Sequence, residues 1–302
     1  MRATPPVLES IESKSEHQRL MELPLQLAAE VQRNVLAALV EDIGGGDLTA
    51  LLTSAGRRSQ GTVVSREEAV LAGTAWFDAC FRRLDPLAAI RWRAHDGERI
   101  AADQTLCEIE ASTRALLTAE RAALNFLQLL SATASATRLY VDAIAGTAAR
   151  IVDTRKTLPG LRLAQKYAVT CGGGSNHRLG LYDGILIKEN HIMAAGGVTA
   201  ALQQAQAIGR DDVFIQIEVE TMEQLAEALD AEARMILLDN MDLAQMRKAV
   251  GLTAGRAELE ASGGISLETV RAIAETGVDR ISVGSLTKDV RAVDLSLRHS
   301  EG

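Results

Sequence analysis

One stretch of the chain, residues 153–191, gathers cationic and protonatable side chains around the glycine run Gly172–Gly174. The chain as a whole is acidic, with a formal net charge of -8. A local basic cluster in an acidic protein predicts a site that concentrates a small anion, and it argues against a surface that coats a nucleic acid. Arginine and lysine suit phosphates and carboxylates, and glycine lets the backbone approach such groups. The alternative is a merely solvated face. The residues concerned are Arg155, Lys156, His177, Arg178 and Lys188.

The second half of the chain must supply the elements that position these residues. Six short apolar runs predict strands, and helical segments separate most of them. Alternating strands and helices predict a parallel sheet, either closed as a barrel or open and doubly wound. The predicted strands are 151–152, 185–187, 213–219, 235–238, 257–261 and 281–283, and the helices are 197–208, 221–230, 242–250 and 266–276.

Polar residues or glycines follow every one of these strands at its carboxyl end. Barrel enzymes carry their functional groups at this end, so the pattern favours a barrel with a site at its mouth. The last two segments, ASGGIS and VGSLT, resemble the phosphate-binding loops that barrels form late in the chain. In chain order the strand-end residues are Asp153, Arg155 and Lys156, then Lys188, Glu218, Asp239, Ser262–Gly264, and Gly284 with Ser285.

Glu218 and Asp239 are carboxylates among these cations. Mg²⁺ prefers one or two carboxylates together with substrate oxygens, so the pair predicts a site for Mg²⁺ or for sugar hydroxyls. They could instead only neutralise the neighbouring cations. His177 could act as a general base or donate a hydrogen bond to an anion.

The first half of the chain has a different pattern. A helix is expected from Leu25 to Glu41, strands and turns from 57 to 110, and a long helix from Thr113 to Ala145. We interpret residues 1–24 as a flexible tail, because they contain no apolar segment like that of a signal peptide. No segment is apolar for long enough to span a membrane.

Composition is that of an ordinary globular protein. The 302 residues, of which 47% are hydrophobic and 24% charged, allow two domains, or one barrel with an addition. The three cysteines have no metal-ligand spacing and form no obvious disulfide framework, which favours the cytoplasm. Cys171 lies beside the glycine run, and we expect it to be a packing residue rather than a nucleophile.

Long, ordered motifs in the chain resemble those of the quinolinate phosphoribosyltransferases, also called nicotinate-nucleotide pyrophosphorylases (carboxylating). The resemblance covers most of the length and does not rest on one short pattern. The motifs are EDIGGGDLT at 41–49, TAERAALNFLQLLS at 118–131, DTRKTLPGLR at 153–162, KYAVTCGGGSNHRLGLYDGILIKENHI at 166–192, IEVE at 217–220, LLDNM at 237–241, EASGGI at 260–265 and ISVGSLT at 281–287.

The resemblance implies a mixed α/β N-terminal domain, residues 25–130, followed by an incomplete α/β (TIM-like) barrel with a C-terminal helix, residues 131–302. It also implies the reaction: quinolinate and phosphoribosyl pyrophosphate give nicotinate mononucleotide, pyrophosphate and CO₂ in NAD biosynthesis. The reaction depends on Mg²⁺ and needs no organic cofactor. A homodimer is implied, in which Arg121 enters the partner's site.

The resemblance further assigns roles to the residues that match its motifs. Arg155, His177, Arg178 and the partner-supplied Arg121 hold the quinolinate carboxylates. Lys156 and Lys188 face the reacting centre and the pyrophosphate, and Glu218 and Asp239 hold ribose hydroxyls and Mg²⁺, directly or indirectly. Lys156, Lys188, Glu218 and Asp239 are the predicted catalytic residues. The remaining predicted substrate-binding residues are Thr154, Ser262, Gly263, Gly264, Val283, Gly284, Ser285 and Lys288.

One residue departs from the family pattern, because Lys288 stands where many members are expected to have His. Two other functions remain open. The first is the related protein of molybdate transport systems, which the intact NHRLGLYDGILIKENH block disfavours. The second is a non-catalytic phosphosugar-binding module, which would be expected to lose some lysines and carboxylates while keeping its glycine loops.

Overall fold

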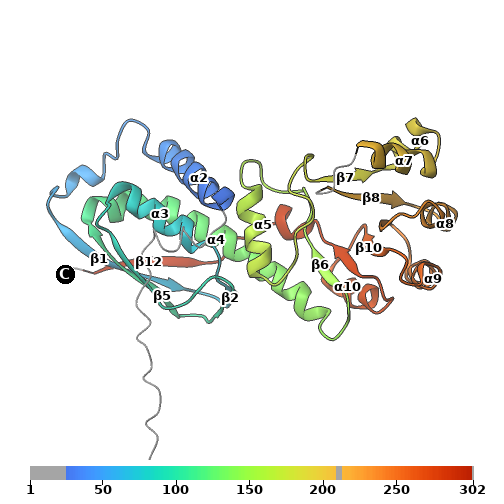
Figure 1. The fold of residues 1–302 in the computed structure, drawn as a ribbon. Coiled ribbons are helices and arrows are strands. Elements are labelled where there is room, and N and C mark those ends of the chain that lie inside the picture. The colour runs from blue at the N-terminus through green and yellow to red at the C-terminus, as the bar shows by residue number, and fades with distance from the viewer. Residues whose placement is uncertain (1–24, 209–212, 301–302) are drawn as a thin grey trace, which may run out of the picture.

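The structure, a computed structural model, describes residues 25–208 and 213–300, and the predicted tail at 1–24 lies outside them. Two lobes stand side by side, and the long helix α4 (Thr113–Ala143) runs from one into the other (Figure 1). The first lobe carries an antiparallel sheet and the second a parallel sheet. The predicted architecture, a mixed α/β domain followed by an incomplete barrel, is confirmed.

The antiparallel sheet of the first lobe has the strand order β12-β1-β5-β3. Its strands are β1 (Arg58–Ser65), β3 (Ala89–Trp92), β5 (Thr105–Ser112) and β12 (Leu295–Ser300). The short strands β2 (Ala69–Val70) and β4 (Arg99–Ile100) pair beside it. Helix α2 (Leu25–Ile43) and the 3-10 turn η1 (Ala50–Leu52) complete the lobe together with part of α4.

Helix α3 (Thr74–Leu84) corrects the prediction of strands and turns throughout 57–110. Its first eight residues, Thr74–Phe81, are all buried, so over these residues the helix exposes no polar side to water. Gly73, with φ of 104°, precedes the helix, and the Asp96 carboxylate accepts hydrogen bonds from the Gly73 and Thr74 N–H groups. Gly73 therefore marks the start of a helix within the region where strands and turns were expected.

The predicted C-terminal helix is wrong. Residues 295–300 form β12, which pairs antiparallel with β1 in the first lobe, with Leu297 opposite Val63. Leu295 and Leu297 are buried and alternate with polar residues, which is the two-residue period of a strand. After the barrel lobe, the chain thus returns to the first lobe, where β12 forms an edge strand of the antiparallel sheet (Figure 1).

The six strands of the second lobe confirm the predicted set. They are β6 (Arg150–Val152), β7 (Gly184–Ile187), β8 (Phe214–Val219), β9 (Met235–Asp239), β10 (Glu258–Ser262) and β11 (Arg280–Ser282). All pairings are parallel, in the order β6-β11-β10-β9-β8-β7. Because β6 and β7 are the two ends of this order, the barrel is incomplete.

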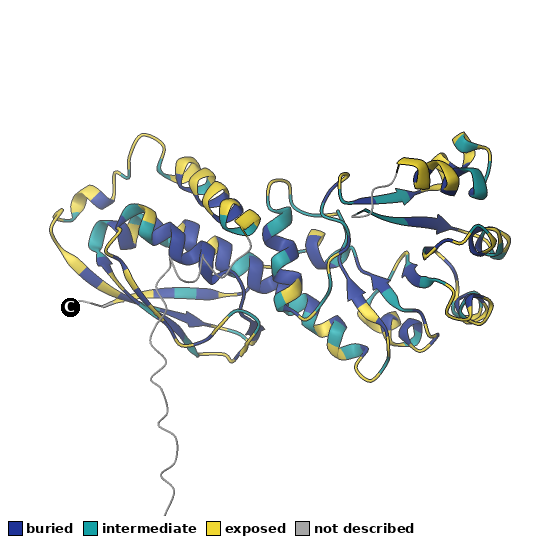
Figure 2. Cartoon of the chain, in the orientation of Figure 1, coloured by how far each residue is buried: buried dark blue, intermediate teal, exposed yellow. Residues whose placement is uncertain are grey.

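Helices α7 (Val198–Ile208), α8 (Met222–Asp230), α9 (Leu243–Thr253) and α10 (Leu267–Ala274) match the prediction. Side chains fix where two of them start, because Thr221 and Asp242 accept from the N–H groups of Gln224 and Gln245. The sequence did not predict α5 (Arg162–Cys171), α6 (Glu189–Ala195) or the short α11 (Ser285–Lys288). In Figure 2 the strands are mostly buried, while α2 and the barrel helices expose their outer sides.

Helix α4 contributes to the cores of both lobes. Leu116 and Leu130 pack in the first core, and Tyr140 packs in the second. The expected domain boundary after residue 130 falls inside this continuous helix. Helix α2 adds a second connection, because Arg33 Nη2 and Asn34 Nδ2 donate to the Gly160 carbonyl at 2.6 and 3.1 Å. The first lobe therefore holds a loop of the barrel lobe.

Candidate active site at the carboxyl edge of the parallel sheet

The strand register places the predicted residues at one edge of the sheet. Asp239, the last residue of β9, pairs with Ser262, the last residue of β10. Val152 at the end of β6 pairs with Ser282 at the end of β11. Because all pairings are parallel, the residues that follow these strands lie at the same edge. The expectation that the six strand ends meet is confirmed.

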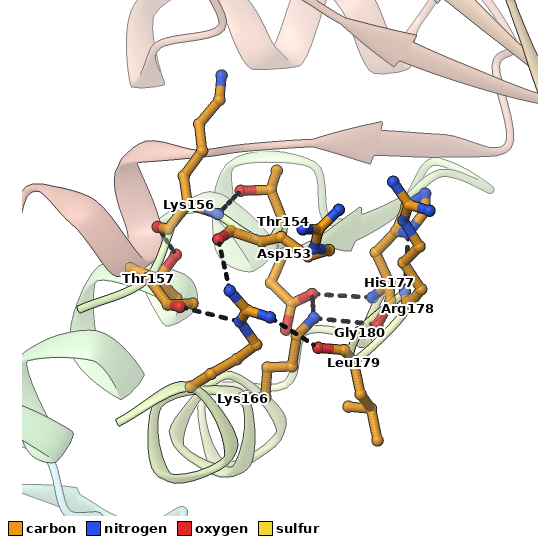
Figure 3. A network of polar contacts seen from close by, with 12 residues as sticks. Asp153, Thr154, Lys156, Thr157, Lys166, His177, Arg178, Leu179 and Gly180 are labelled. Atoms are coloured by element: carbon orange, nitrogen blue, oxygen red, sulfur yellow. Dashed lines mark hydrogen bonds and ion pairs between the residues drawn. The ribbon is translucent and has the colours of Figure 1, made fainter. Parts of the chain in front are cut away.

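Lys156 lies against the loop that follows β11. A Cβ atom added to Gly284 would come 3.0 Å from Lys156 Cδ and 3.7 Å from Thr154 Oγ1. Glycine at this position therefore lets the Lys156 side chain cross the loop. Thr154 Oγ1 accepts from the Lys156 N–H at 3.0 Å, and the exposed Lys156 side chain extends away from the buried contacts below it (Figure 3). Lys156 thus joins the predicted phosphate loop.

A lysine and two carboxylates occupy the other side of the edge. Lys188 Nζ contacts Glu218 Oε2 at 2.8 Å, and Glu218 is buried while Lys188 is about half exposed. Burial raises the pKa of Asp239; the Lys188 charge lowers it and the nearby Glu220 and Glu189 raise it. Lys188 therefore contacts one predicted carboxylate and lies within electrostatic range of the other.

The guanidinium groups of Arg155 and Arg178 lie within electrostatic range of each other, and the Asp183 carboxylate is also near Arg178. Burial lowers the pKa of Arg178, and the positive charge of Arg155 lowers it further. Arg178 Nη1 donates to the Gly184 carbonyl at 3.0 Å. The Arg155 Nε is buried and has no hydrogen-bond partner within the described residues. Neighbouring arginines, one with an unused buried donor, are the kind of groups that bind carboxylates.

Beneath this edge, Asp153 and Lys166 form a completely buried ion pair (Figure 3). Lys166 Nζ also donates to the His177 carbonyl at 3.0 Å, and Asp153 Oδ1 accepts from the His177 N–H at 2.8 Å. Burial raises the pKa of Asp153 to about 6 against the opposing effect of Lys166. Asp153, expected among the polar residues of the mouth, instead anchors the segment that carries His177 and Arg178.

His177 is buried, and both of its ring nitrogens are used within the protein. Nδ1 accepts from the Arg178 N–H at 2.7 Å, so the ring proton is on Nε2, which donates to Gln216 Oε1 at 2.7 Å. Burial lowers the pKa of His177, although Glu260 opposes the effect. The imidazole is therefore neutral, and its contacts in this structure position Arg178.

The hydrogen bonds of His177 continue into the barrel interior. Gln216 Nε2 donates to Glu260 Oε2 at 3.1 Å, and the Arg280 guanidinium lies 3.0 Å from the same oxygen. Gln216 and Glu260 are almost completely buried. This chain of polar groups crosses β8, β10 and β11, so it fixes the imidazole from below.

The predicted phosphate loops have the backbone conformations that glycine permits. Gly263 and Gly264 have φ of 101° and 58°. A Cβ on Gly263 would lie 2.1 Å from Asn240 Oδ1, so the loops after β9 and β10 approach each other closely. Val283 is buried, Ser285 Oγ is 3.4 Å from Tyr140 Oη, and the exposed Lys288 pairs with Asp289 at 3.2 Å.

The Gly172–Gly174 run has a packing role, which corrects its expected role beside an anion. Cβ atoms at Gly172 and Gly174 would come within 2.5 and 2.8 Å of Thr137 on α4. The glycines therefore allow the chain to pack tightly against α4. Burial raises the pKa of the neighbouring Cys171 thiol to about 12, so this thiol is protonated near neutral pH.

Arg121 lies apart from the strand-end residues. It is exposed on α4 and lines a pocket of about 360 Å³ between α2, α4 and the loop at 159–161. Asn125 lines the same pocket. None of the strand-end residues of the barrel is part of this lining within the described chain.

The edge of the sheet carries two carboxylates, Glu218 and Asp239, as candidate metal ligands. The described residues contain no group of three or more His, Cys, Asp or Glu side chains placed to hold a metal ion. Glu218 and Asp239 nevertheless fit Mg²⁺, because this ion takes one or two protein carboxylates and fills its other positions with substrate phosphates and water.

Among the described residues, no helix is long and apolar enough to cross a bilayer.

Comparison with known proteins adds evidence over nearly the whole chain. Residues 133–298 match the C-terminal domain of quinolinate phosphoribosyl transferase, and residues 47–131 match its N-terminal domain. The chain belongs to the quinolinate phosphoribosyl transferase family. It is therefore a pentosyltransferase.

Named relatives of this family member are similar over most of both chains. A nicotinate-nucleotide pyrophosphorylase (carboxylating) of Mycobacterium leprae is 44% identical, covering 86% of this chain and 94% of the relative. A probable enzyme of that name from Bacillus subtilis is 41% identical, covering 85% and 89%. The solved structure of nicotinate-nucleotide pyrophosphorylase from Francisella tularensis is 41% identical, with a TM-score of 0.88, covering 93% and 99%.

Several buried polar residues that support this candidate site were not predicted from the sequence. Lys166, Gln216 and Glu260 lie on helix or strand segments whose apolar neighbours are buried. The only signal was a charged or amide side chain inside a segment that must be buried, such as Gln216 within FIQIEV. Gln165 and Thr287, also completely buried, were missed in the same way.

Proposed function

We propose that this chain converts quinolinate and phosphoribosyl pyrophosphate to nicotinate mononucleotide, pyrophosphate and CO₂, in NAD biosynthesis, at the carboxyl edge of the parallel sheet. One observation supports it most: Lys156 reaches from its loop to Gly284, and the same loop carries Arg155, whose buried Nε has no hydrogen-bond partner among the described residues. A dicarboxylate and a phosphosugar therefore have adjacent sites. The intact lysines and carboxylates disfavour a non-catalytic module, and the named relatives disfavour the molybdate-transport protein.

Arg155 and Arg178 bind the two carboxylates of quinolinate. The Arg178 N–H bond to His177 Nδ1 and the Arg178 bond to Gly184 hold its guanidinium in place before substrate arrives. Prior positioning reduces the entropy lost on binding. His177 acts through Arg178 and stays neutral, so it does not compete for the carboxylates.

The pyridine nitrogen then attacks the anomeric carbon of phosphoribosyl pyrophosphate from the face opposite the pyrophosphate. Lys156 and Lys188 stabilise the negative charge that develops on the leaving pyrophosphate. Glu218 and Asp239 hold ribose hydroxyls and Mg²⁺, and the bound metal would neutralise pyrophosphate charge. The loops Ser262–Gly264 and Val283–Ser285, with Lys288, take the 5′-phosphate.

Decarboxylation follows from the bond that has formed. The ring nitrogen now carries a positive charge, so the pyridinium accepts the electron pair of the C–C bond as the 2-carboxylate leaves as CO₂. A proton replaces the carboxylate on the ring. The chain needs no organic cofactor for this step because the substrate itself is the electron sink.

The site is completed by a second subunit in a homodimer. Arg121 lines a pocket in which none of the strand-end residues takes part, which supports this, because a residue on the first lobe could reach the barrel mouth of a partner. A cytoplasmic setting is supported by the three free thiols, Cys80, Cys107 and Cys171. Neither a nucleic acid nor a membrane is a proposed partner.

An assay with two acids tests the proposed activity. With Mg²⁺ and phosphoribosyl pyrophosphate, quinolinate should yield nicotinate mononucleotide, and nicotinate should be a very poor substrate. Nicotinate lacks one carboxylate and would leave a cation unpaired, at a cost of about 2–5 kcal/mol. Product from nicotinate but not from quinolinate would overturn the proposed activity. Comparable turnover of both acids would contradict a site that binds two carboxylates.

Subunit mixing tests the role of Arg121. Arg121→Ala and Lys156→Ala should each retain only a small, measurable fraction of the activity, and heterodimers of the two should contain one intact site. Activity should recover to about half that of wild type per heterodimer. If exchange is demonstrated by mass spectrometry and no activity returns, Arg121 does not act across the interface.

A further inference from the structure

Two loops of the proposed site are tied together by buried side chains that bind no substrate. One loop, residues 154–161, carries Arg155 and Lys156. The other begins at Gly284 and continues into α11. They follow β6 and β11, which are adjacent strands. Their backbone atoms are linked through Gln165 of α5 and Thr287 of α11, both completely buried.

The hydrogen bonds run from one loop to the other and back. Thr287 Oγ1 donates to the Lys156 carbonyl at 2.8 Å. Gln165 Nε2 donates to the Thr287 carbonyl at 2.8 Å, and Gln165 Oε1 accepts from the Leu158 N–H at 2.8 Å. The backbone is therefore held directly at Lys156 and two residues later, by groups that are themselves joined.

Such a link restricts where the Lys156 ammonium can go. The Lys156 N–H is already held by Thr154 Oγ1, so hydrogen bonds fix the backbone on both sides of its Cα. The side chain lies over Gly284, the residue that precedes α11. A movement of α11 would therefore move both the phosphate loop and the base of the lysine.

We infer that Gln165 and Thr287 are positioning residues, which hold Lys156 at a fixed place relative to the phosphate loop at Gly284–Ser285. The inference rests on the proposed function, and it adds two residues that contact neither substrate nor metal. Loss of the Thr287 hydroxyl leaves the lysine present but misplaced. Misplacement of a reacting group by about 1 Å can reduce the rate roughly a hundredfold.

Three variants separate positioning from a general loss of stability. Thr287→Val keeps the shape and removes the hydroxyl, and we expect kcat to fall by about tenfold to a hundredfold. Thr287→Ser keeps the hydroxyl and should restore most of the activity. Thr276→Val is the matched control, because Thr276 is also buried and donates to the Ile273 carbonyl at 2.6 Å, but it lies before β11 at the opposite end of the strand.

A double-mutant cycle with Lys156→Ala gives the decisive readout. If Thr287 acts through Lys156, Thr287→Val should cause no further loss in the Lys156→Ala background. An equal fractional loss in both backgrounds would overturn the inference, as would a Thr287→Val enzyme with wild-type kcat. Should Thr287→Val be unfolded at the assay temperature, Gln165→Met takes its place in the same cycle and is judged by the same outcomes.

The affinity for phosphoribosyl pyrophosphate, measured by calorimetry without quinolinate, repeats the cycle without turnover. Thr287→Val should weaken binding when Lys156 is present and should leave it unchanged when Lys156 is absent. An effect that is the same in both backgrounds contradicts the inference. Wild-type protein that binds phosphoribosyl pyrophosphate but forms no product contradicts the proposed function alone.

Discussion

Two lysine–carboxylate pairs of the barrel lobe have the same chemistry and different surroundings. Lys166 and Asp153 are completely buried beneath the edge of the sheet. Lys188 and Glu218 meet at 2.8 Å at the edge itself, where the lysine is 48% exposed. Burial keeps a ligand away from Lys166, whose ammonium group also donates to the His177 carbonyl. The exposed lysine keeps donors free for a ligand.

The comparison separates the residues that build the site from those that act in it. A buried charge is costly unless it is paired and hydrogen-bonded, so its partner cannot be removed without loss of stability. A pair with a half-exposed lysine loses less by separating, because water can replace the partner of the lysine. The Lys188–Glu218 pair can therefore open to receive a substrate, whereas Lys166–Asp153 cannot.

The largest expected effect is on stability, from Lys166→Met. The variant leaves the Asp153 carboxylate buried and unpaired, and the free energy of unfolding at pH 8 should fall by about 3–5 kcal/mol. Denaturant titration measures this. Adding Asp153→Asn should recover part of the loss, and a loss below about 1 kcal/mol would show that the pair is not essential to the fold.

The same variant should be less impaired in acid. An acid whose pKa is raised on folding binds its proton more tightly when folded, so it destabilises the fold as pH rises. Burial raises the pKa of Asp153 to about 6 even beside Lys166. The deficit of Lys166→Met should therefore shrink between pH 8 and pH 5, and a deficit independent of pH would contradict it.

Lys188→Met should reverse the pattern, with a large loss of activity and a smaller loss of stability. Removal of one donor to a developing charge reduces kcat by about 100-fold or more. The free energy of unfolding should fall by less than in Lys166→Met, because Lys188 is half exposed and only Glu218 of this pair is buried. Steady-state kinetics and denaturant titration on the same preparation check both. A stability loss as large as that of Lys166→Met would show that Lys188 also stabilises the fold and is not reserved for the substrate.

His177 provides a smaller effect within the buried region. Burial lowers its pKa below the ordinary 6.5, so the folded state binds fewer protons than the unfolded state as the pH falls. Its contribution to stability is therefore present above pH 6.5 and is lost as the pH falls through the folded pKa. NMR titration of the imidazole, assigned with His177→Gln, should give a midpoint below 6.5. A midpoint above 6.5 would show a cationic ring that binds anions itself.

The smallest effect should come from an exposed pair far from the edge. Arg93 directly follows β3, and its Nη2 lies 2.9 Å from Oε1 of Glu108 on β5; both side chains are nearly half exposed. Arg93→Ala should change the free energy of unfolding by at most about 1 kcal/mol and leave kcat unchanged. A larger change would mean that exposure alone does not separate the two kinds of pair.

Local patterns determined much of this protein. Apolar runs separated by helical periods predicted the six parallel strands, because burial on both faces of a parallel strand requires such runs. The residues that follow them, from Arg155 to Ser285, predicted a site at one edge, because parallel strands all end on the same side. The capped starts of α8 and α9 depend on residues only three positions apart, so they too could be predicted from sequence.

Tertiary structure decided what local patterns cannot contain. Helix α3 is buried over its first eight residues by packing within the first lobe. β12 is a strand because it pairs with β1, more than 200 residues earlier. Asp153 and Lys188 both follow strands, and only packing made one inaccessible and left the other open. The bonds from Thr287 to Lys156 and from His177 to Gln216 join residues distant in the sequence. Burial and long-range contact are properties of the assembled fold, and they decide which charged residues stabilise it and which remain available for chemistry.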